Sequence, residues 1–262
     1  MEPFVWNANP ILFEVGPLSV KWYGVLFATG FLVGYAIMSR IFRLEGKPQE
    51  DLGDLLLYMM VATVVGARLG HCFFYAPEYY LSNPLDIVKV WEGGLASHGG
   101  AIGITLGLWL YARLHPSQPF LWLLDRIAVP TALAGSFIRL GNFFNSEIIG
   151  VPSDRPWAVI FARVDHIPRH PAQLYESLAY LVIFGVLAVV YRRQGPDVSR
   201  GKLLGLFLVL VFGARLLIET LKTQQAAYSL PFAMSVGQLL SIPAILIGIW
   251  FVWASSSKQW SV

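Results

Sequence analysis

The sequence predicts an all-α, polytopic integral membrane protein with about seven transmembrane helices and a small extracytoplasmic subdomain. Of its 262 residues 56% are hydrophobic and only 13% are charged, and the mean hydropathy is +0.58. Soluble domains carry about 25% charged residues. Apolar stretches of roughly 17 to 25 residues, long enough to cross a bilayer, recur along the chain. We therefore expect residues 1–262 to form a single integral membrane domain.

The chain opens with a segment that is too short to span a membrane. It contains two prolines, so we expect Ile11 to Val20 to lie at the membrane interface. The first residues lack the basic start of a secretory signal peptide, and we expect none to be cleaved. Trp22 and Tyr23 then open the first span, and such an aromatic pair is typical of the interfacial belt. Taken alone, Tyr23 is an interfacial anchor.

The remaining spans follow from the apolar stretches in order. We place the seven spans at about 22–39, 55–74, 98–113, 121–144, 172–191, 203–221 and 236–254. Residues 145–170 are polar, with several prolines and charges, and form the longest segment between spans. We expect this segment to be an extracytoplasmic insertion.

Basic residues set the expected orientation. Arg40, Arg43 and Lys47 follow the first span, and another basic group follows the fifth, with Arg192 and Arg193 in it. Loops rich in Lys and Arg stay in the cytoplasm. The sequence therefore predicts an N-terminus outside and a C-terminus in the cytoplasm.

Three arginines lie inside the spans and need a physical reason. Arg68, Arg139 and Arg215 occur in spans two, four and six, which all run outward. Each is about 12 to 18 residues into its span, which places it toward the outer leaflet at 1.5 Å per residue. Glu219, four residues after Arg215, can pair with it along one helix face. Positive charge remains in excess, so we expect an anionic ligand such as a phospholipid headgroup.

The segment from Arg139 to Gly150 concentrates the polar chemistry. Asn142 lies three residues after Arg139 and projects from the same helix face, and Glu147 follows the end of the span. A guanidinium fork beside a carboxamide suits an anionic oxygen. The alternative is that Arg139 pairs with Asp125, Glu147 or a carbonyl, in a self-satisfied network that joins helices.

His98 is the candidate general base because it stands before two glycines at the outer end of span three. A helix-terminal histidine hydrogen-bonded to backbone would give the same pattern. Cys72 is the only cysteine and reads as a small buried hydrophobe, since the adjacent His71 points in another direction. The spacing of ligand-type residues predicts no metal site, and we expect no cofactor and no nucleic acid.

Six segments, taken in order, resemble the motifs of the bacterial prolipoprotein diacylglyceryl transferases. They are Trp22-Tyr-Gly, His98-Gly-Gly, Arg139-Leu-Gly-Asn-Phe-Phe-Asn-Ser-Glu, Arg169-His-Pro-Ala-Gln-Leu-Tyr-Glu, Arg215-Leu-Leu-Ile-Glu and Gly237-Gln-Leu-Leu-Ser-Ile-Pro243. The resemblance runs from Tyr23 to Pro243. Each motif alone is weak, but six in order are specific.

The resemblance implies a reaction in the bacterial inner membrane. The diacylglyceryl group of phosphatidylglycerol passes to the lipobox cysteine of a prolipoprotein signal peptide, which forms a thioether and releases glycerol phosphate. Arg139 and Arg215 would hold and stabilise the phosphate, and His98 would accept the thiol proton. The sulfur arrives on the substrate, so Cys72 need not be catalytic. The remaining residues expected to bind lipid or support the site are Tyr23, Asn142, Glu147, Gly150 and Glu219.

This sequence departs from the family pattern at a few positions. Ser146 stands where the family usually has glycine, and Lys222-Thr-Gln replaces a run that usually contains arginine. A tyrosine often found before the Arg215 segment is missing. These departures concern the outer lid and proton handling.

Two other classes of membrane protein would also place charged or polar residues inside the spans. A transporter of anions or lipids would use the same arginines as a binding site, but it should show halves with matching broken helices. Polar residues here gather on the outer side. An intramembrane protease would need a Gly-x-Ser-x-Gly elbow or paired membrane aspartates, and the sequence has neither.

Overall fold

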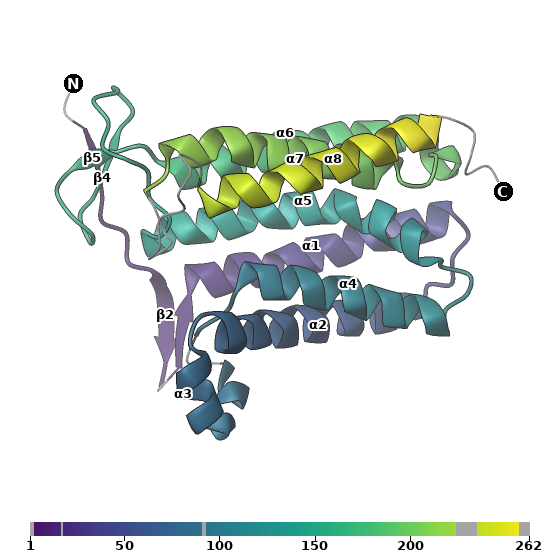
Figure 1. Ribbon diagram of the computed structural model, residues 1–262, viewed down its shortest axis with the longest axis horizontal. Helices are drawn as coiled ribbons and strands as arrows, with labels where there is room; N and C mark the ends of the chain where they lie inside the picture. The colour runs from purple at the N-terminus through teal and green to yellow at the C-terminus, as the bar shows by residue number, and fades with distance from the viewer. Residues whose placement is uncertain (1–2, 17, 91–92, 224–234, 257–262) are drawn as a thin grey trace. The chain divides into compact units, whose positions relative to one another are not determined.

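The computed structural model describes residues 3–16, 18–90, 93–223 and 235–256. The chain forms two compact units. The first unit combines Met1–Ile37 with Asp125–Val262, and the second unit is Met38–Leu124. Figure 1 labels the elements, and each unit is described by itself.

Each predicted span corresponds to one long helix, and the all-α class is confirmed. The helices are α1 (Trp22–Leu44), α2 (Asp51–Phe74), α4 (Ser97–Leu114), α5 (Phe120–Asn145), α6 (Ala172–Gln194), α7 (Lys202–Ile218) and α8 (Val236–Ser256). Among the described residues, six helices are long and apolar enough to cross a membrane. The exception is α4, in which four glycines, His98 and Arg113 lower the hydropathy. The predicted count of seven is therefore not confirmed.

In the second unit, α2 and α4 pack through glycines. A Cβ atom added at Gly70 would lie 2.6 Å from the Cα of Gly99, and one added at Gly103 would lie 2.9 Å from the Cα of Gly66. Small residues spaced by four are typical of helices that approach closely in membranes. The segment between α2 and α4 contains the short helix α3 (Pro77–Ser82) and the 3-10 helix η1 (Pro84–Val88).

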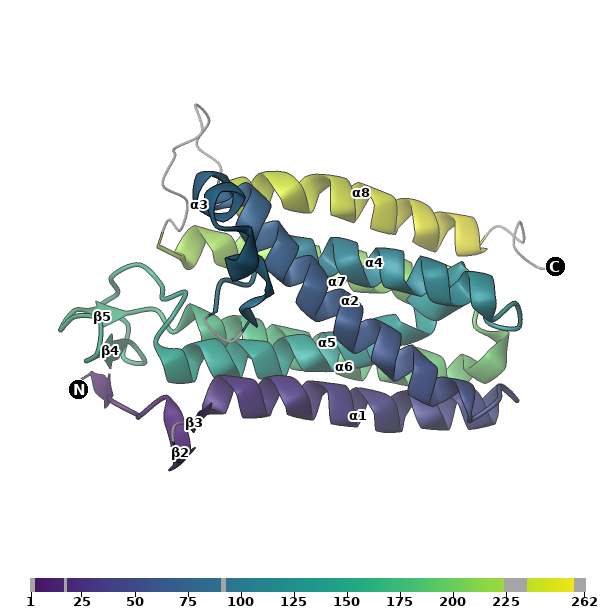
Figure 2. The same cartoon turned by 90° about the horizontal axis from the view of Figure 1, so that it is seen from below.

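In the first unit, close contacts join neighbouring helices. A Cβ at Gly30 of α1 would lie 3.1 Å from the Cβ of Ala134 on α5, and both views show these helices side by side (Figures 1 and 2). The hydroxyls of Ser136 on α5 and Ser177 on α6 are 2.9 Å apart. Helices α7 and α8 also run side by side (Figure 1). Glycine and serine thus let the backbones of this unit approach.

The beginning of α7 is capped by a side chain from another helix. The carboxylate of Asp125, fully buried on α5, accepts hydrogen bonds from the backbone N–H groups of Gly201 at 3.0 Å and Leu204 at 2.8 Å. The first N–H groups of a helix lack partners within it, so such an acceptor stabilises the helix end. Asp125 therefore has a structural role in the first unit.

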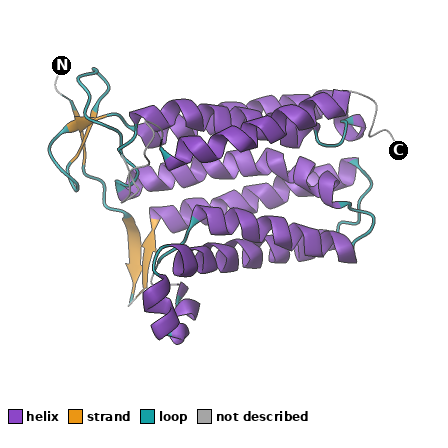
Figure 3. Cartoon of the chain, in the orientation of Figure 1, coloured by secondary structure: helices purple, strands orange, loops and turns teal. Residues whose placement is uncertain are grey.

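Short strands form two small sheets that the sequence analysis did not predict (Figure 3). In one sheet β4 (Val159–Phe161) lies between β1 (Phe4–Trp6), which is parallel to it, and β5 (Pro168–Arg169), which is antiparallel. The other is an antiparallel hairpin of β2 (Ile11–Val15) and β3 (Leu18–Lys21), where we expected an interfacial segment.

A small apolar core connects the β1–β4–β5 sheet to the end of α5. Phe143, Ile149, Val159 and Phe161 are buried together, and Trp6 packs against them. The indole Nε1 of Trp6 donates a hydrogen bond of 3.0 Å to the backbone carbonyl of Phe143. The region 145–170 is therefore folded onto the helix end that carries Arg139 and Asn142.

Candidate functional site

The site begins at the last turns of α5. The Nη1 of Arg139 donates to the Oδ1 of Asn142 at 3.2 Å, and the Nδ2 of Asn142 donates to the Oε2 of Glu147 at 3.2 Å. The side-chain amide of Asn145 also donates to Glu147, at 3.0 Å. The predicted placement of Arg139 and Asn142 on one face is confirmed.

The counter-ion of Arg139 is Glu176, a fully buried residue of α6. The Nε of Arg139 lies 3.0 Å from the Oε2 of Glu176. The two groups form an ion pair and not a hydrogen bond, since the Oε2 of Glu176 accepts no hydrogen bond from the described residues. Tyr180, one turn further along α6, interacts electrostatically with Arg139. The alternative prediction that Arg139 pairs with Asp125 is wrong, since the Asp125 carboxylate caps the start of α7.

Lys222 extends this pair into a chain of charges. Its Nζ lies 2.7 Å from the Oε1 of Glu176 and 3.0 Å from the Oε2 of Glu219, and its side chain is 4% exposed. Arg139, Glu176, Lys222 and Glu219 thus form what we call the ion-pair chain. It joins α5, α6 and the 3-10 helix η4 (Glu219–Leu221).

Glu219 is held in place from the other side by the start of α8. Its Oε1 accepts a hydrogen bond of 3.2 Å from the hydroxyl of Ser235. A Cβ at Gly237 would lie 2.5 Å from the same oxygen, so a larger residue there would require the Glu219 carboxylate to shift.

Arg215 lies on α7, one turn before Glu219. The predicted pair of Arg215 with Glu219 is wrong, because Lys222 is the ion-pair partner of that carboxylate and Arg215 acts on it only at longer range. Tyr180 lies within electrostatic range of both Arg139 and Arg215. The Nε of Arg215 is buried without a hydrogen-bond partner in the part of the chain that the structure describes. A buried donor of this kind favours an acceptor supplied by a ligand.

Tyr23, at the start of α1, lies beside the last turns of α5, near Arg139 and Glu147. A Cβ at Gly141 would lie 2.8 Å from the Cδ2 of Tyr23, so the tyrosine ring packs directly on the backbone of α5. Tyr23 interacts electrostatically with Glu147 and Arg139. It begins a span, as an interfacial tyrosine does, and also contacts the site.

Gly150 acts through its backbone. Its N–H donates to the carbonyl of His170 at 3.0 Å, and the next N–H donates to the carbonyl of Leu221 at 2.9 Å. A Cβ at position 150 would lie 2.5 Å from the Cβ of His170 and 2.8 Å from the Leu221 oxygen. Glycine is therefore required where the segment after α5 passes between α6 and η4.

Arg169 holds the Gly150 segment from outside the helices. Its Nη1 donates to the Gly150 carbonyl at 3.3 Å, and its Nη2 pairs with the Oδ2 of Asp165 at 2.6 Å. Through this hydrogen bond the guanidinium keeps the pKa of Asp165 below its ordinary value.

Ser146 stands where the resemblance leads us to expect glycine, and its backbone conformation shows why glycine suits this position. Its φ of 56° lies in the left-handed region, where glycine has no steric penalty and other residues are strained. The residue ends α5 and turns the chain toward Glu147. Its hydroxyl is buried and has no hydrogen-bond partner among the described residues.

Sequence analysis missed several residues of this site. Gln173 is fully buried and donates from Nε2 to the backbone carbonyl of Glu147 at 2.5 Å. Gln173 and Glu176 lie three residues apart on one face of α6, and this spacing within the Arg169 motif was the signal for them. Lys222 had been placed in an outer loop, and Tyr180 reads as an ordinary apolar span residue. Glu176, which binds Lys222, and Arg139, which interacts with Tyr180, are distant from these residues in the sequence, so local patterns do not show the contacts.

His98 belongs to the second unit. It is an exposed residue on the first turn of α4, after the extended residue Ala96. Arg68, which we grouped with Arg139 and Arg215, is 3% exposed and binds backbone carbonyls of its own unit.

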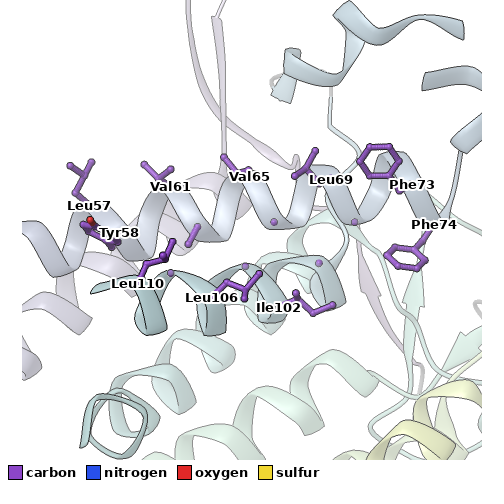
Figure 4. A pocket seen from close by; sticks show the side chains of 16 residues that line it. Leu57, Tyr58, Val61, Val65, Leu69, Phe73, Phe74, Ile102, Leu106 and Leu110 are labelled. Atoms are coloured by element: carbon purple, nitrogen blue, oxygen red, sulfur yellow. The ribbon is translucent and has the colours of Figure 1, made fainter. Parts of the chain in front are cut away.

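An apolar groove runs along α2 and α4 (Figure 4). Its volume is about 600 Å³, and its lining includes Val61, Val65 and Leu69 on α2 and Ile102 and Leu106 on α4. None of the described residues that line it is charged. The groove itself therefore offers surface for apolar groups only.

The electrostatics of the first unit favour an anion. The ion-pair chain and Arg215 together hold three cations, Arg139, Lys222 and Arg215, against the carboxylates of Glu176 and Glu219. Glu147 is bound by two amides at the exposed edge. Buried charges are stable when paired, so the remaining positive charge calls for a negatively charged ligand.

The chain matches known proteins over almost its whole length. The family model described as prolipoprotein diacylglyceryl transferase matches residues 10–254. A phosphatidylglycerol–prolipoprotein diacylglyceryl transferase of Tolumonas auensis is 56% identical over 97% of this chain and 98% of the relative. Proteins of the same name from Chloroherpeton thalassium and Porphyromonas gingivalis are 52% and 42% identical, over 95% and 94% of this chain and 93% of each relative.

Proposed function

The chain belongs to the prolipoprotein diacylglyceryl transferase family, and from this we propose that it transfers the diacylglyceryl group of phosphatidylglycerol to the cysteine thiol of a prolipoprotein. It is a multi-pass membrane transferase. The observation that carries the proposal for the site is the excess of positive charge around Arg139 and Arg215, beside a buried donor that lacks a partner.

The reaction exchanges one bond for another. The cysteine sulfur attacks the terminal glyceryl carbon that carries the phosphate, a C–S bond forms, and the C–O bond to the phosphate breaks. The bonding electrons leave with the oxygen, so glycerol phosphate departs with an added negative charge. Arg139 and Arg215 are our candidates for stabilising this charge, because guanidinium groups bind phosphate oxygens through paired N–H donors.

The other predicted residues receive supporting roles in this proposal. Asn142 and Glu147 fix the fork of Arg139, and Glu219 anchors Lys222 beside Arg215. Tyr23 and Gly150 shape the backbone and ring surfaces around them. His98 is the candidate acceptor of the thiol proton, a role that comes from the family resemblance and from the ordinary pKa of imidazole.

We also propose where the reaction takes place. The protein would lie in the bacterial inner membrane with its N-terminus outside and its C-terminus in the cytoplasm. The insertion 145–170 would then be extracytoplasmic, as part of a single integral membrane domain. The partner would be a signal peptide with a lipobox cysteine, because only a secreted precursor presents its thiol at the outer leaflet.

The alternative of an anion or lipid transporter is not favoured. Family membership supports transfer, and the ion-pair chain with Arg215 lies near the ends of α5 and α7 and the start of α6. A transport path needs polar groups at both depths.

The phosphate clamp is tested by charge-conserving substitutions. Arg139→Lys and Arg215→Lys should each lower kcat by roughly 10² to 10³, since a point charge does not reproduce a bidentate fork. The assay measures transfer from phosphatidylglycerol vesicles to a lipobox peptide. Arg192→Lys, at the exposed end of α6, is the matched control and should keep parental activity. Near-normal turnover of either clamp variant would contradict the proposal.

A further inference from the structure

Arg68 is a buried cation for which neither the family resemblance nor the phosphate clamp provides a role. It lies near the outer end of α2 and is only 3% exposed. A charge at membrane depth costs roughly 2.5 to 3.5 kcal/mol on insertion scales unless polar partners surround it. Its partners are therefore informative.

Those partners are backbone carbonyls of the outer loop. The Nε of Arg68 donates to Ile87 at 2.9 Å, and Nη2 donates to Asp86 at 2.5 Å. Nη1 donates to the carbonyl of Gly93 and reaches that of Gly94 at 3.5 Å. One guanidinium thus ties two parts of the loop together, which a lysine ammonium with its single nitrogen cannot do.

The conformation of this loop requires its glycines. Gly93 and Gly94 have φ values of 94° and 69°. A Cβ at Gly94 would lie 2.5 Å from the Cδ2 of His71 and 3.0 Å from the Nη1 of Arg68. The loop backbone is therefore pressed against α2 at the point where Arg68 binds it.

The same loop leads directly into the first turn of α4. The N–H of Ala96 donates to the carbonyl of Ala67, next to Arg68, at 2.9 Å. Gly99 then packs on Gly70 with the two backbones in contact. His98 lies between these two attachment points, so its backbone position depends on the loop that Arg68 holds.

We propose that Arg68 is a positioning residue that sets the place of His98 by binding the backbone carbonyls of Asp86, Ile87, Gly93 and Gly94. This inference rests on the proposed role of His98 as base. It predicts that replacing the guanidinium of Arg68 displaces the imidazole of His98, which itself remains intact. A displacement of about 1 Å can cost on the order of 10² in rate.

The test is a double-mutant cycle on the full-length protein in phosphatidylglycerol vesicles, with a lipobox peptide as acceptor. Arg68→Gln should lower kcat at pH 7 on the order of 10², with little change in the KM for phosphatidylglycerol. In a His98→Ala background the same substitution should change kcat less than about twofold, because residues that act through each other are not additive. Equal fold-losses in both backgrounds would mean that Arg68 only stabilises the loop, and would overturn the inference.

Two controls keep the result interpretable. Gly94→Ala retains the guanidinium but displaces the loop, and should reproduce the His98-dependent loss even if Arg68→Gln inserts poorly. Arg113→Gln, whose guanidinium stacks on Trp109 at 4.5 Å in the same unit, should be neutral. If His98→Ala keeps parental activity from pH 7 to about pH 9, His98 is not the base and the inference fails. The Lys variants of Arg139 and Arg215 then still decide the phosphate clamp separately.

Discussion

Lys222 illustrates how much of the site depends on single residues. Its ammonium lies between the carboxylates of Glu176 and Glu219, each within 3.0 Å. The family usually has arginine in this stretch, so the cationic charge is kept while the fork is lost. We expected Lys222 in an outer loop, because its partner Glu176 on α6 is 46 residues away in the sequence and only the fold brings the two together.

The ion-pair chain predicts separate effects on stability and activity. Glu176→Gln deprives Arg139 of its counter-ion, and Lys222→Met leaves Glu176 and Glu219 with one cation fewer. Breaking a buried ion pair in this way costs about 3 to 5 kcal/mol. The double variant removes the Glu176–Lys222 pair but leaves Arg139 and Glu219 without these partners, so it should recover only part of the lost thermal stability in detergent, as measured by circular dichroism. Transfer activity should stay low, because Arg139 still lacks the carboxylate at its Nε.

Lys222→Arg is the conservative control for this experiment. It keeps the charge between Glu176 and Glu219 and should retain activity and stability. Recovery of both activity and stability in the double variant would show that the chain only stabilises the fold.

At the scale of elements, hydropathy predicted the helices well. Spans expected at about 22–39, 121–144 and 236–254 correspond to α1, α5 and α8 with end shifts of a few residues, since apolar length is a local property. The strands were missed for the opposite reason. Strand β1 pairs with β4, with Phe4 opposite Val159, and no local pattern reports a partner so distant in the chain.

The same contrast holds for the polar residues. The i to i+3 spacing correctly placed Asn142 beside Arg139. Spacing also suggested that Arg215 pairs with Glu219, but Lys222 competes more closely for that carboxylate. Arg68 was grouped with the other arginines, and its carbonyl partners in residues 86–94 could not be read from hydropathy.

The glycine contact between α2 and α4 gives a prediction for one pair of elements. In Gly103→Ala the new Cβ would meet the Ala62 carbonyl and lie 2.9 Å from the Gly66 Cα, and backbone atoms cannot move individually. We expect a loss of about 1 to 3 kcal/mol of stability, seen as a lower midpoint of thermal unfolding in detergent. Gly53→Ala on α2 meets nothing within 4 Å and is the control, with unchanged or slightly higher stability. Equal midpoints for the two variants would contradict the close packing.

At the scale of the whole molecule, the proposed chemistry depends on sidedness. The thiol of a secreted precursor and the phosphate clamp must meet at the outer leaflet, whereas the orientation rests on the basic residues alone. The structure makes sidedness testable, because Asn83 of the second unit and Asp154 and Gln194 of the first unit are all exposed. Labelling at these positions then reports the side of the membrane and not burial. Lys258, a further inner position, lies outside the described residues.

The experiment uses a membrane-impermeant maleimide on intact cells. The parent carries Cys72→Ala, since the fully buried Cys72 is the only native thiol. Asn83→Cys and Asp154→Cys should be labelled from outside, and Gln194→Cys only after the membrane is permeabilised. Labelling of Gln194→Cys in intact cells would reverse the orientation and remove the clamp from the outer leaflet. Labelling of only one of Asn83→Cys and Asp154→Cys would place the corresponding loops of the two units on opposite sides, and His98 and Arg139 could then not act on one substrate.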